Sequence, residues 1–196
     1  GVALLEADPN WPLQMPEDWS WGQVLGVSVD AQDHIWVTHS SQVVEFDPEG
    51  NLLRTWGGTQ AGDEWPRMLH GLFVDHNDYV WSGAREQHTI FKFTKDGEVV
   101  LTIGQLDQMG NSSEPYLLGR PAEFYVDPDT NELYVADGYT NRRIIVYDAE
   151  TGGYLRQWGA YGNEPDDDYQ YPEEEAQAPQ QFRLLHGITS SKDDLV

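Results

Sequence analysis

The chain shows a recurring pattern of short apolar runs separated by polar, turn-forming residues. Four such runs lie between residues 27 and 56, and Ser, Asp, Asn, Pro and Gly fill the gaps between them. Short runs bounded by these residue types are typical of strands in a β-meander. A four-stranded meander of about 40 residues is the size of one blade of a β-propeller. The strands expected in this unit are Val27–Asp30, Ile35–Thr38, Val43–Asp47 and Leu52–Trp56.

The same unit recurs twice more along the chain. The second copy predicts strands at Leu72–Asp75, Tyr79–Ser82, Thr89–Thr94 and Val99–Ile103. The third copy predicts strands at Glu123–Asp127, Leu133–Ala136, Ile144–Asp148 and Tyr154–Trp158. Each fourth strand ends in the same way, on an apolar residue followed by glycine at Gly57, Gly104 and Gly159. We therefore predict an all-β fold of the propeller class.

The repeat divides the chain into a lead-in, complete blades and a partial blade. We expect the proline-rich residues 1–20 to form an irregular lead-in, because proline lacks the backbone N–H donor that a central strand needs. Trp11 and Trp19 are expected to hold this lead-in against the blades. The blades are predicted at 21–62, 63–110 and 118–162, with an acidic loop at 163–181 and a partial blade at 182–196. About three and a third blades cannot close a ring, and an open ring leaves unpaired edges. We therefore expect the remaining blades to come from a longer chain or a second segment.

Charge and composition narrow the possible partners. The 196 residues carry a formal charge of −23, from 34 acidic and 11 basic side chains. This charge disfavours nucleic acid and anionic lipid surfaces, which need clustered Lys and Arg. Cysteine is absent, so disulfides and thiolate metal sites are excluded. The acidic loop fits a solvated, extended segment, with a weak cation site as the lesser alternative.

A histidine recurs at one position of the repeat. Counting along the first strand of each unit, the same position holds Leu25, His70, Ala122 and His186. First strands line the central channel of a propeller, so histidine in alternate blades of a six-bladed ring would place imidazoles about 120° apart. Zinc with three His ligands and one open position is a catalytic arrangement. The alternative is that His70 and His186 are hydrogen-bonded channel residues without a metal.

Two motifs resemble a known family. Residues 136–145 read ADGYTNRRII, which is similar to an NHL-repeat signature, and 69–72 and 185–187 read LHGL and LHG. Together they resemble peptidyl-α-hydroxyglycine α-amidating lyase over residues 21–196. That resemblance implies a six-bladed NHL-type propeller with a catalytic zinc and a structural calcium. It also implies cleavage of peptidyl-α-hydroxyglycine to a peptide amide and glyoxylate.

The resemblance assigns roles to individual residues. His70 and His186 match two zinc ligands, and Val27 and Leu72 match positions whose backbone carbonyls bind calcium, an ion that takes oxygen ligands. Tyr139 matches the catalytic tyrosine, which beside zinc would take the substrate hydroxyl proton; the alternative for Tyr139 is packing at a blade edge. The third histidine, the last calcium ligand and a second family arginine would lie beyond residue 196.

The chain departs from the family pattern in the first blade. A substrate-binding arginine of the family corresponds here to His39-Ser40, and Arg85 in the next blade is the candidate to replace its charge. Three functions therefore remain open. They are a metal-dependent lyase for peptidyl-α-hydroxyglycine or a related α-hydroxy amide, a lactonase-like metal-dependent hydrolase, and a non-catalytic NHL scaffold. The expected partner is a peptide or small-molecule substrate for an enzyme, or a protein for a scaffold. We expect a secreted or periplasmic location.

Overall fold

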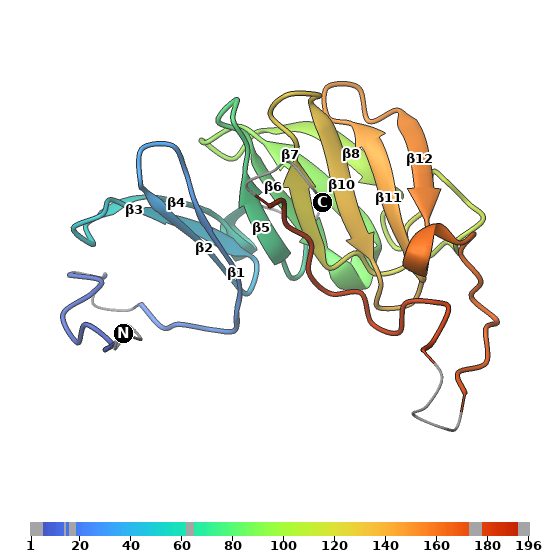
Figure 1. Cartoon of the computed structure of the whole chain (residues 1–196). Coiled ribbons are helices and arrows are strands. Elements are labelled where there is room, and N and C mark those ends of the chain that lie inside the picture. The colour runs from blue at the N-terminus through green and yellow to red at the C-terminus, as the bar shows by residue number, and fades with distance from the viewer. Residues whose placement is uncertain (1–5, 14, 16–18, 62–64, 173–177, 192–196) are drawn as a thin grey trace.

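The described part of the chain contains three four-stranded antiparallel sheets (Figure 1). The computed structural model describes residues 6–13, 15, 19–61, 65–172 and 178–191. The first sheet contains β1 (Val24–Val29), β2 (Ile35–His39), β3 (Gln42–Phe46) and β4 (Leu52–Gly57). The second contains β5 (His70–Val74), β6 (Val80–Ala84), β7 (Thr89–Phe93) and β8 (Val99–Gly104). The third contains β9 (Glu123–Val126), β10 (Glu132–Asp137), β11 (Arg143–Asp148) and β12 (Tyr154–Trp158).

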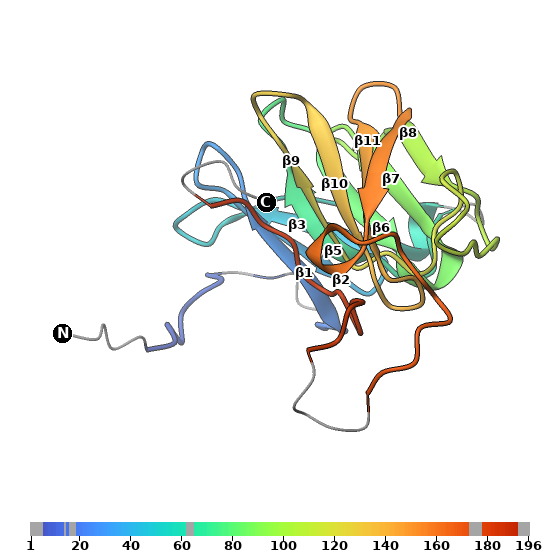
Figure 2. The same ribbon diagram turned by 45° about the vertical axis from the view of Figure 1, so that its right-hand side comes forward.

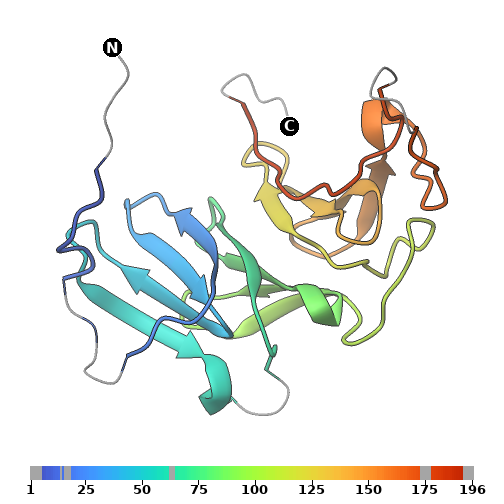
Figure 3. The ribbon, with the colours of Figure 1, turned by 90° about the horizontal axis from the view of Figure 1, so that it is seen from below.

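Each sheet is a meander in which sequence neighbours pair, as expected for propeller blades. Figure 3 shows the three sheets fanning out, with the first blade in blue and the third in yellow and orange. The first strands β1, β5 and β9 lie next to one another at the inner side. Only three short 3₁₀ helices occur in the described residues, η1 (Gly58–Ala61), η2 (Arg85–Gln87) and η3 (Ala160–Gly162), and none of the described helices could span a membrane. The all-β partial propeller is confirmed.

Two glycines permit the inner strands to approach closely. A Cβ atom at Gly26 would lie 2.8 Å from the backbone nitrogen of Leu72, on the next inner strand. Gly71 has a φ of +71°, and a Cβ there would lie 2.5 Å from the carbonyl oxygen of Ala122 in the third blade. Both contacts are closer than a side chain allows, so the glycine after His70 is needed for the convergence of blades at the hub.

The Asp residues expected to end the first strands lie just outside them. Asp30 accepts hydrogen bonds from the backbone nitrogens of Gln32 and His34, and from the indole of Trp36. Asp75 repeats this arrangement in the second blade, where its indole donor is Trp81. A carboxylate that accepts backbone N–H groups forms an Asx-type turn and ends the strand. The predicted strands therefore end one residue too late at Asp30 and Asp75, and the observed strands begin earlier, at Val24 and His70.

Apolar side chains fill the spaces between blades. Trp36 and Val43 of the first blade pack with Phe91 and Phe93 of the second, and Trp81 of the second packs with residues of the third. The outer face of the first blade is covered by the lead-in, through Trp11, Met15 and Trp19. Tryptophan therefore holds the lead-in as expected. Trp19 lies against the ring of His39, with 4.8 Å between ring centroids.

The segment after the third blade differs from the expected pattern in two respects. The acidic loop is tied to the connection between the second and third blades, because Asp167 accepts hydrogen bonds from the backbone and hydroxyl of Ser112. The expectation of a purely solvated loop is therefore wrong at this residue. The described part of the expected fourth blade, 182–191, forms no strand and makes one isolated bridge, Gly138 to Leu185. This segment, dark red in Figure 2, crosses near the inner strands. It carries His186 to the hub without sheet pairing.

Candidate active site at the propeller hub

His70 is the first residue of β5 and is buried at the hub. Its Nδ1 lies 3.0 Å from the carbonyl oxygen of Ala122 in the third blade. A carbonyl oxygen only accepts, so Nδ1 carries the hydrogen and Nε2 presents a lone pair. Burial lowers the pKa of His70, and the positive charge of Arg85 acts in the same direction. The imidazole is therefore neutral near pH 7, with its lone pair directed away from the Ala122 contact.

Tyr139 connects the two histidines that the sequence placed at one repeat position. Its hydroxyl oxygen lies 3.2 Å from Nε2 of His70 and 2.7 Å from Nε2 of His186. The two imidazole centroids are 5.3 Å apart. His186 reaches this position because Leu185, the residue before it, bridges to Gly138, the residue before Tyr139. Three side chains from distant parts of the chain therefore meet at one point.

The loop that carries Tyr139 is anchored by a buried ion pair. Asp137 and Arg143 are both fully buried, and Nε of Arg143 donates to Asp137 at 2.9 Å. Asp137 also accepts from the backbone of Gly119 and from the side chain of Asn141. Arg143 donates further to the carbonyls of Ser112, Glu114 and Leu117 and to Gln157. Sequence reasoning quoted these residues as part of the repeat signature and gave them no role; the Asp-Gly-Tyr-x-Asn-x-Arg spacing was the available signal.

Arg85 lies beside Tyr139, although the two residues belong to different blades. Its guanidinium carbon is 4.7 Å from the centroid of the tyrosine ring. Its Nε donates to Glu86 at 2.9 Å, and Glu86 also pairs with Arg120. In the first blade, His39 is held by Gln42 and by the backbone of Gly22, so its ring nitrogens are already occupied. Arg85 thus brings a cation into contact with one of the three converging side chains.

The donor set fits a transition metal. The Nε2 atoms of two imidazoles and one phenol oxygen converge, and imidazole nitrogen is a preferred zinc ligand. The contact of His70 with the Ala122 carbonyl is the arrangement that orients metal-bound histidines, because it fixes the tautomer and the ring plane. The geometry therefore accommodates an ion bound by His70 and His186.

The two positions expected to bind calcium through carbonyls lie on neighbouring inner strands, Val27 on β1 and Leu72 on β5. Leu72 is buried, whereas the side chain of Val27 is exposed. A nearby acid was missed by sequence reasoning. Burial raises the pKa of Glu123 at the start of β9, while the backbone N–H groups of Phe124 and Leu72 act to lower it. Glu123 is thus an acidic group next to Leu72, and nothing in its sequence context marks it.

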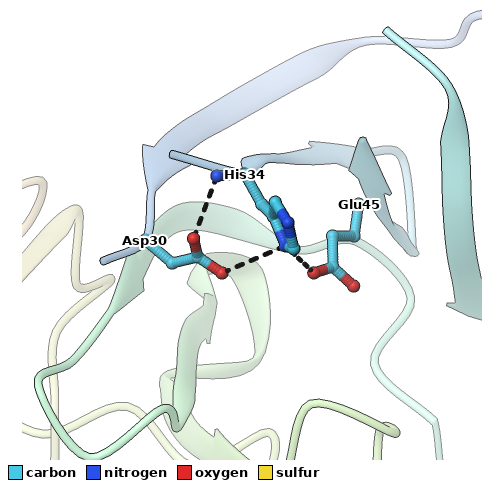
Figure 4. Close-up of side chains that lie close together, drawn as sticks. All are labelled: Asp30, His34 and Glu45. Carbon is cyan, nitrogen blue, oxygen red and sulfur yellow. Dashed lines mark hydrogen bonds and ion pairs between the residues drawn. The ribbon is translucent and has the colours of Figure 1, made fainter. Parts of the chain in front are cut away.

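A second group of potential ligands lies away from the hub, between the first and second blades (Figure 4). His34 Nδ1 lies 2.8 Å from Glu45 Oε1 and 3.7 Å from Asp30 Oδ2. Both buried carboxylates already have cationic partners, since Arg54 pairs with Glu45 and Lys95 pairs with Asp30 at 3.2 Å. A metal ion would have to displace these cations. The cluster is therefore an ionic clamp that joins the two blades.

This clamp predicts a pH effect on stability. Partial burial acts to raise the pKa of Asp30, but the hydrogen bonds from Trp36, His34, Gln32 and Lys95 together lower it. A depressed folded-state pKa stabilises the fold above the unfolded pKa of about 3.9 and loses that contribution as pH falls through the folded value. We expect Asp30→Asn to cost about 1–2 kcal/mol at pH 7 and less at pH 3, measured by urea unfolding. Asp96→Asn is the control, because Asp96 is exposed and pairs only with Arg54; an equal loss at both pH values for Asp30→Asn would contradict this account.

Comparison with known proteins places this site in a family context. Peptidyl-glycine alpha-amidating monooxygenase B of Xenopus laevis is 26% identical over 96% of this chain, and peptidyl-alpha-hydroxyglycine alpha-amidating lyase 1 of Drosophila melanogaster is 32% identical over 61%. Human NHL repeat-containing protein 3 is 29% identical over 72%. The chain is a partial β-propeller that is similar in sequence to α-amidating lyases and to an NHL repeat-containing protein. No family model matches the chain.

Solved structures agree on the fold. A virginiamycin B lyase from Staphylococcus aureus superposes with a TM-score of 0.53 at 16% identity, covering 74% of this chain and 43% of that one. The RRP9 WD40 repeats give a TM-score of 0.52 at 13% identity, covering 68% and 38%. At these identities the likeness concerns the propeller fold alone. This chain spans 22% of the length of the Xenopus enzyme and 21% of the length of the Drosophila lyase.

Proposed function

We propose that this chain provides the catalytic face of a metal-dependent lyase that cleaves peptidyl-α-hydroxyglycine, or a related α-hydroxy amide, to a peptide amide and glyoxylate. The observation that carries the proposal is the convergence of Tyr139 with Nε2 of His70 and of His186. The relatives named as amidating lyases and monooxygenases support the reaction class.

In this proposal His70 and His186 hold zinc, together with a third histidine in a blade outside this sequence, since catalytic zinc usually has three protein ligands. When bound, the ion supplies Lewis-acid polarisation of the substrate hydroxyl oxygen. The Ala122 carbonyl keeps the Nε2 lone pair of His70 directed to the hub. The buried Asp137–Arg143 pair keeps the Tyr139 loop in place, which lowers the cost of positioning the reacting groups.

Tyr139 acts as the base in the proposed reaction. In its phenolate form it takes the proton from the α-hydroxyl group, the electron pair of that O–H bond forms the aldehyde C=O bond, and the C–N bond breaks. The same proton then passes to the amide nitrogen, so the products are a neutral peptide amide and glyoxylate. Arg85 is a positioning cation for the α-carboxylate, because its Nε pairs with Glu86 and its terminal nitrogens keep their donors.

We further propose a structural calcium bound partly by the carbonyls of Val27 and Leu72, which lie on adjacent inner strands. Glu123 next to Leu72 would add negative charge at this position. A bound ion that is absent from the unfolded state raises stability. We expect chelation of the protein to lower its melting temperature and calcium to restore it; an unchanged melting temperature would remove calcium from the proposal.

The function is tested by incubating the zinc-loaded protein with a peptidyl-α-hydroxyglycine and measuring glyoxylate and peptide amide. Stoichiometric release of both products, lost on chelation and restored by zinc, is the expected result. Turnover of lactones or esters without glyoxylate would favour a hydrolase instead. A protein that binds no zinc and turns over none of these substrates would be a scaffold. We also propose a secreted or periplasmic location, which fractionation of the producing cells would test.

A further inference from the structure

A cavity of about 230 Å³ lies beside the Tyr139 loop. It is lined by residues 138–142 and by Tyr171, Phe182, Arg183 and Leu184. Tyr139 therefore borders both this cavity and the cluster of imidazoles. The cavity is formed where the acidic loop and the segment leading to His186 pack against the third blade.

The cavity contains two arginines that form no ion pair with the carboxylates of residues 6–13, 15, 19–61, 65–172 and 178–191. Every other Lys and Arg side chain in the part of the chain that the structure describes forms an ion pair with a carboxylate. Arg142 and Arg183 form none with any described residue, although the chain has 34 acidic residues against 11 basic ones. Two guanidiniums in one cavity that pair with no described carboxylate offer positive charge to an anionic ligand there.

The positions of these arginines are fixed by other contacts. Nη1 of Arg142 donates to the carbonyls of Asp166 at 3.0 Å and Tyr169 at 2.8 Å, which hold the guanidinium without neutralising it. The carboxylate of the nearby Asp167 is used by Ser112.

Both guanidiniums also face one aromatic ring. The guanidinium carbons of Arg142 and Arg183 lie 4.9 and 5.5 Å from the ring centroid of Tyr171. Burial raises the pKa of the Tyr171 phenol, and the two arginines oppose that shift. The aromatic ring thus orients the arginines while leaving their N–H donors for another group.

The repeat provides an internal comparison. Arg67 precedes His70 by three residues, and Arg183 precedes His186 by three residues. In the second blade this arginine is neutralised by Asp107 at 2.6 Å. The fourth-unit copy, at the equivalent position, contacts the Tyr171 ring instead. The repeat arginine therefore lacks a described carboxylate partner at the cavity beside Tyr139 and has one in the second blade.

We propose that this cavity binds an acidic side chain of the peptide, on the residue that precedes the reacting α-hydroxyglycine. The inference rests on the proposed function, because it assumes that the reacting residue lies at Tyr139. In the proposed function Arg85, which lies over the Tyr139 ring, serves the α-carboxylate, so the cavity arginines are available to a second anionic group. A volume of about 230 Å³ admits a Glu or Asp side chain, and paired guanidiniums favour carboxylates over amides.

Binding without turnover gives the first test. Calorimetry with N-acetyl dipeptide amides ending in Glu or Gln should show about tenfold tighter binding of the Glu peptide, as for a charge-assisted hydrogen bond. Arg183→Gln should reduce that ratio to about one. Arg67→Gln removes the same charge at the equivalent repeat position and should leave the ratio unchanged. A ratio of about one in the wild type, or an equal loss in both variants, overturns the proposal.

Turnover distinguishes the two carboxylates of the substrate. With peptidyl-α-hydroxyglycines carrying Glu or Gln before the reacting residue, Arg183→Gln should lower kcat/KM only for the Glu substrate. An equal fall for both substrates would assign Arg183 to the α-carboxylate and overturn the side-chain proposal. If the Glu peptide binds in an Arg183-dependent manner but no glyoxylate forms with any substrate, the acidic subsite stands and the lyase function fails.

Discussion

Tyr139→Phe should lower kcat for glyoxylate release by about 10³-fold while zinc content stays at the wild-type level. The substitution removes the one oxygen that contacts Nε2 of both His70 and His186 and keeps the aromatic ring under Arg85. A group that acts only in the transition state changes kcat more than it changes KM. Steady-state kinetics with metal analysis of each preparation measure both quantities.

Two variants control this experiment. Tyr161→Phe removes a phenol that is 75% exposed outside the hub, and it should leave kcat unchanged. His70→Ala should abolish turnover and also lower zinc content, because it removes a ligand rather than a base. A Tyr139→Phe enzyme that retains wild-type kcat would contradict the assignment of Tyr139 as the base.

Arg143→Met should destabilise the protein by about 3–5 kcal/mol, because it leaves Asp137 buried without its cation. The variant also removes the donor to the carbonyl of Leu117, whereas the carbonyl of Ser112 keeps its hydrogen bond from Gln157. Urea unfolding followed by tryptophan fluorescence measures the loss of free energy. Since Asp137 begins the Tyr139 loop, we expect kcat to fall together with stability.

The matched control is Arg156→Met, in the same sheet. Arg156 pairs with Glu132 near the surface, and such pairs contribute at most about 1 kcal/mol. A double variant, Arg143→Met with Asp137→Leu, should recover part of the loss, because it removes the uncompensated charge. If Arg143→Met and Arg156→Met destabilise the protein equally, the buried pair has no special role in holding the loop.

The number of complete blades and the positions of their strands could be predicted from the sequence. Alternating apolar runs and turn residues specify strands through local backbone preferences, and the threefold recurrence located each strand to within a few residues. The repeat position of His70 and His186 also followed from the sequence, because equivalent residues of successive blades occupy equivalent places at one axis. The Asp residues at the strand ends were misplaced by one residue, since their carboxylates bind the following turn.

The side-chain contacts at the hub and in the cavity depend on how the blades pack in three dimensions. The contact between Tyr139 and both histidines joins parts of the chain that are 69 and 47 residues apart. The repeat pattern cannot give that distance, because it depends on how blades pack side by side. The roles of Arg143 and of the two cavity arginines, Arg142 and Arg183, also could not be predicted from the repeat pattern, because nothing in the sequence distinguishes these three arginines. Arg143 pairs with a buried carboxylate, whereas Arg142 and Arg183 contact backbone carbonyls or an aromatic ring. The role of each arginine is set by its burial and its partners, and both depend on the whole fold.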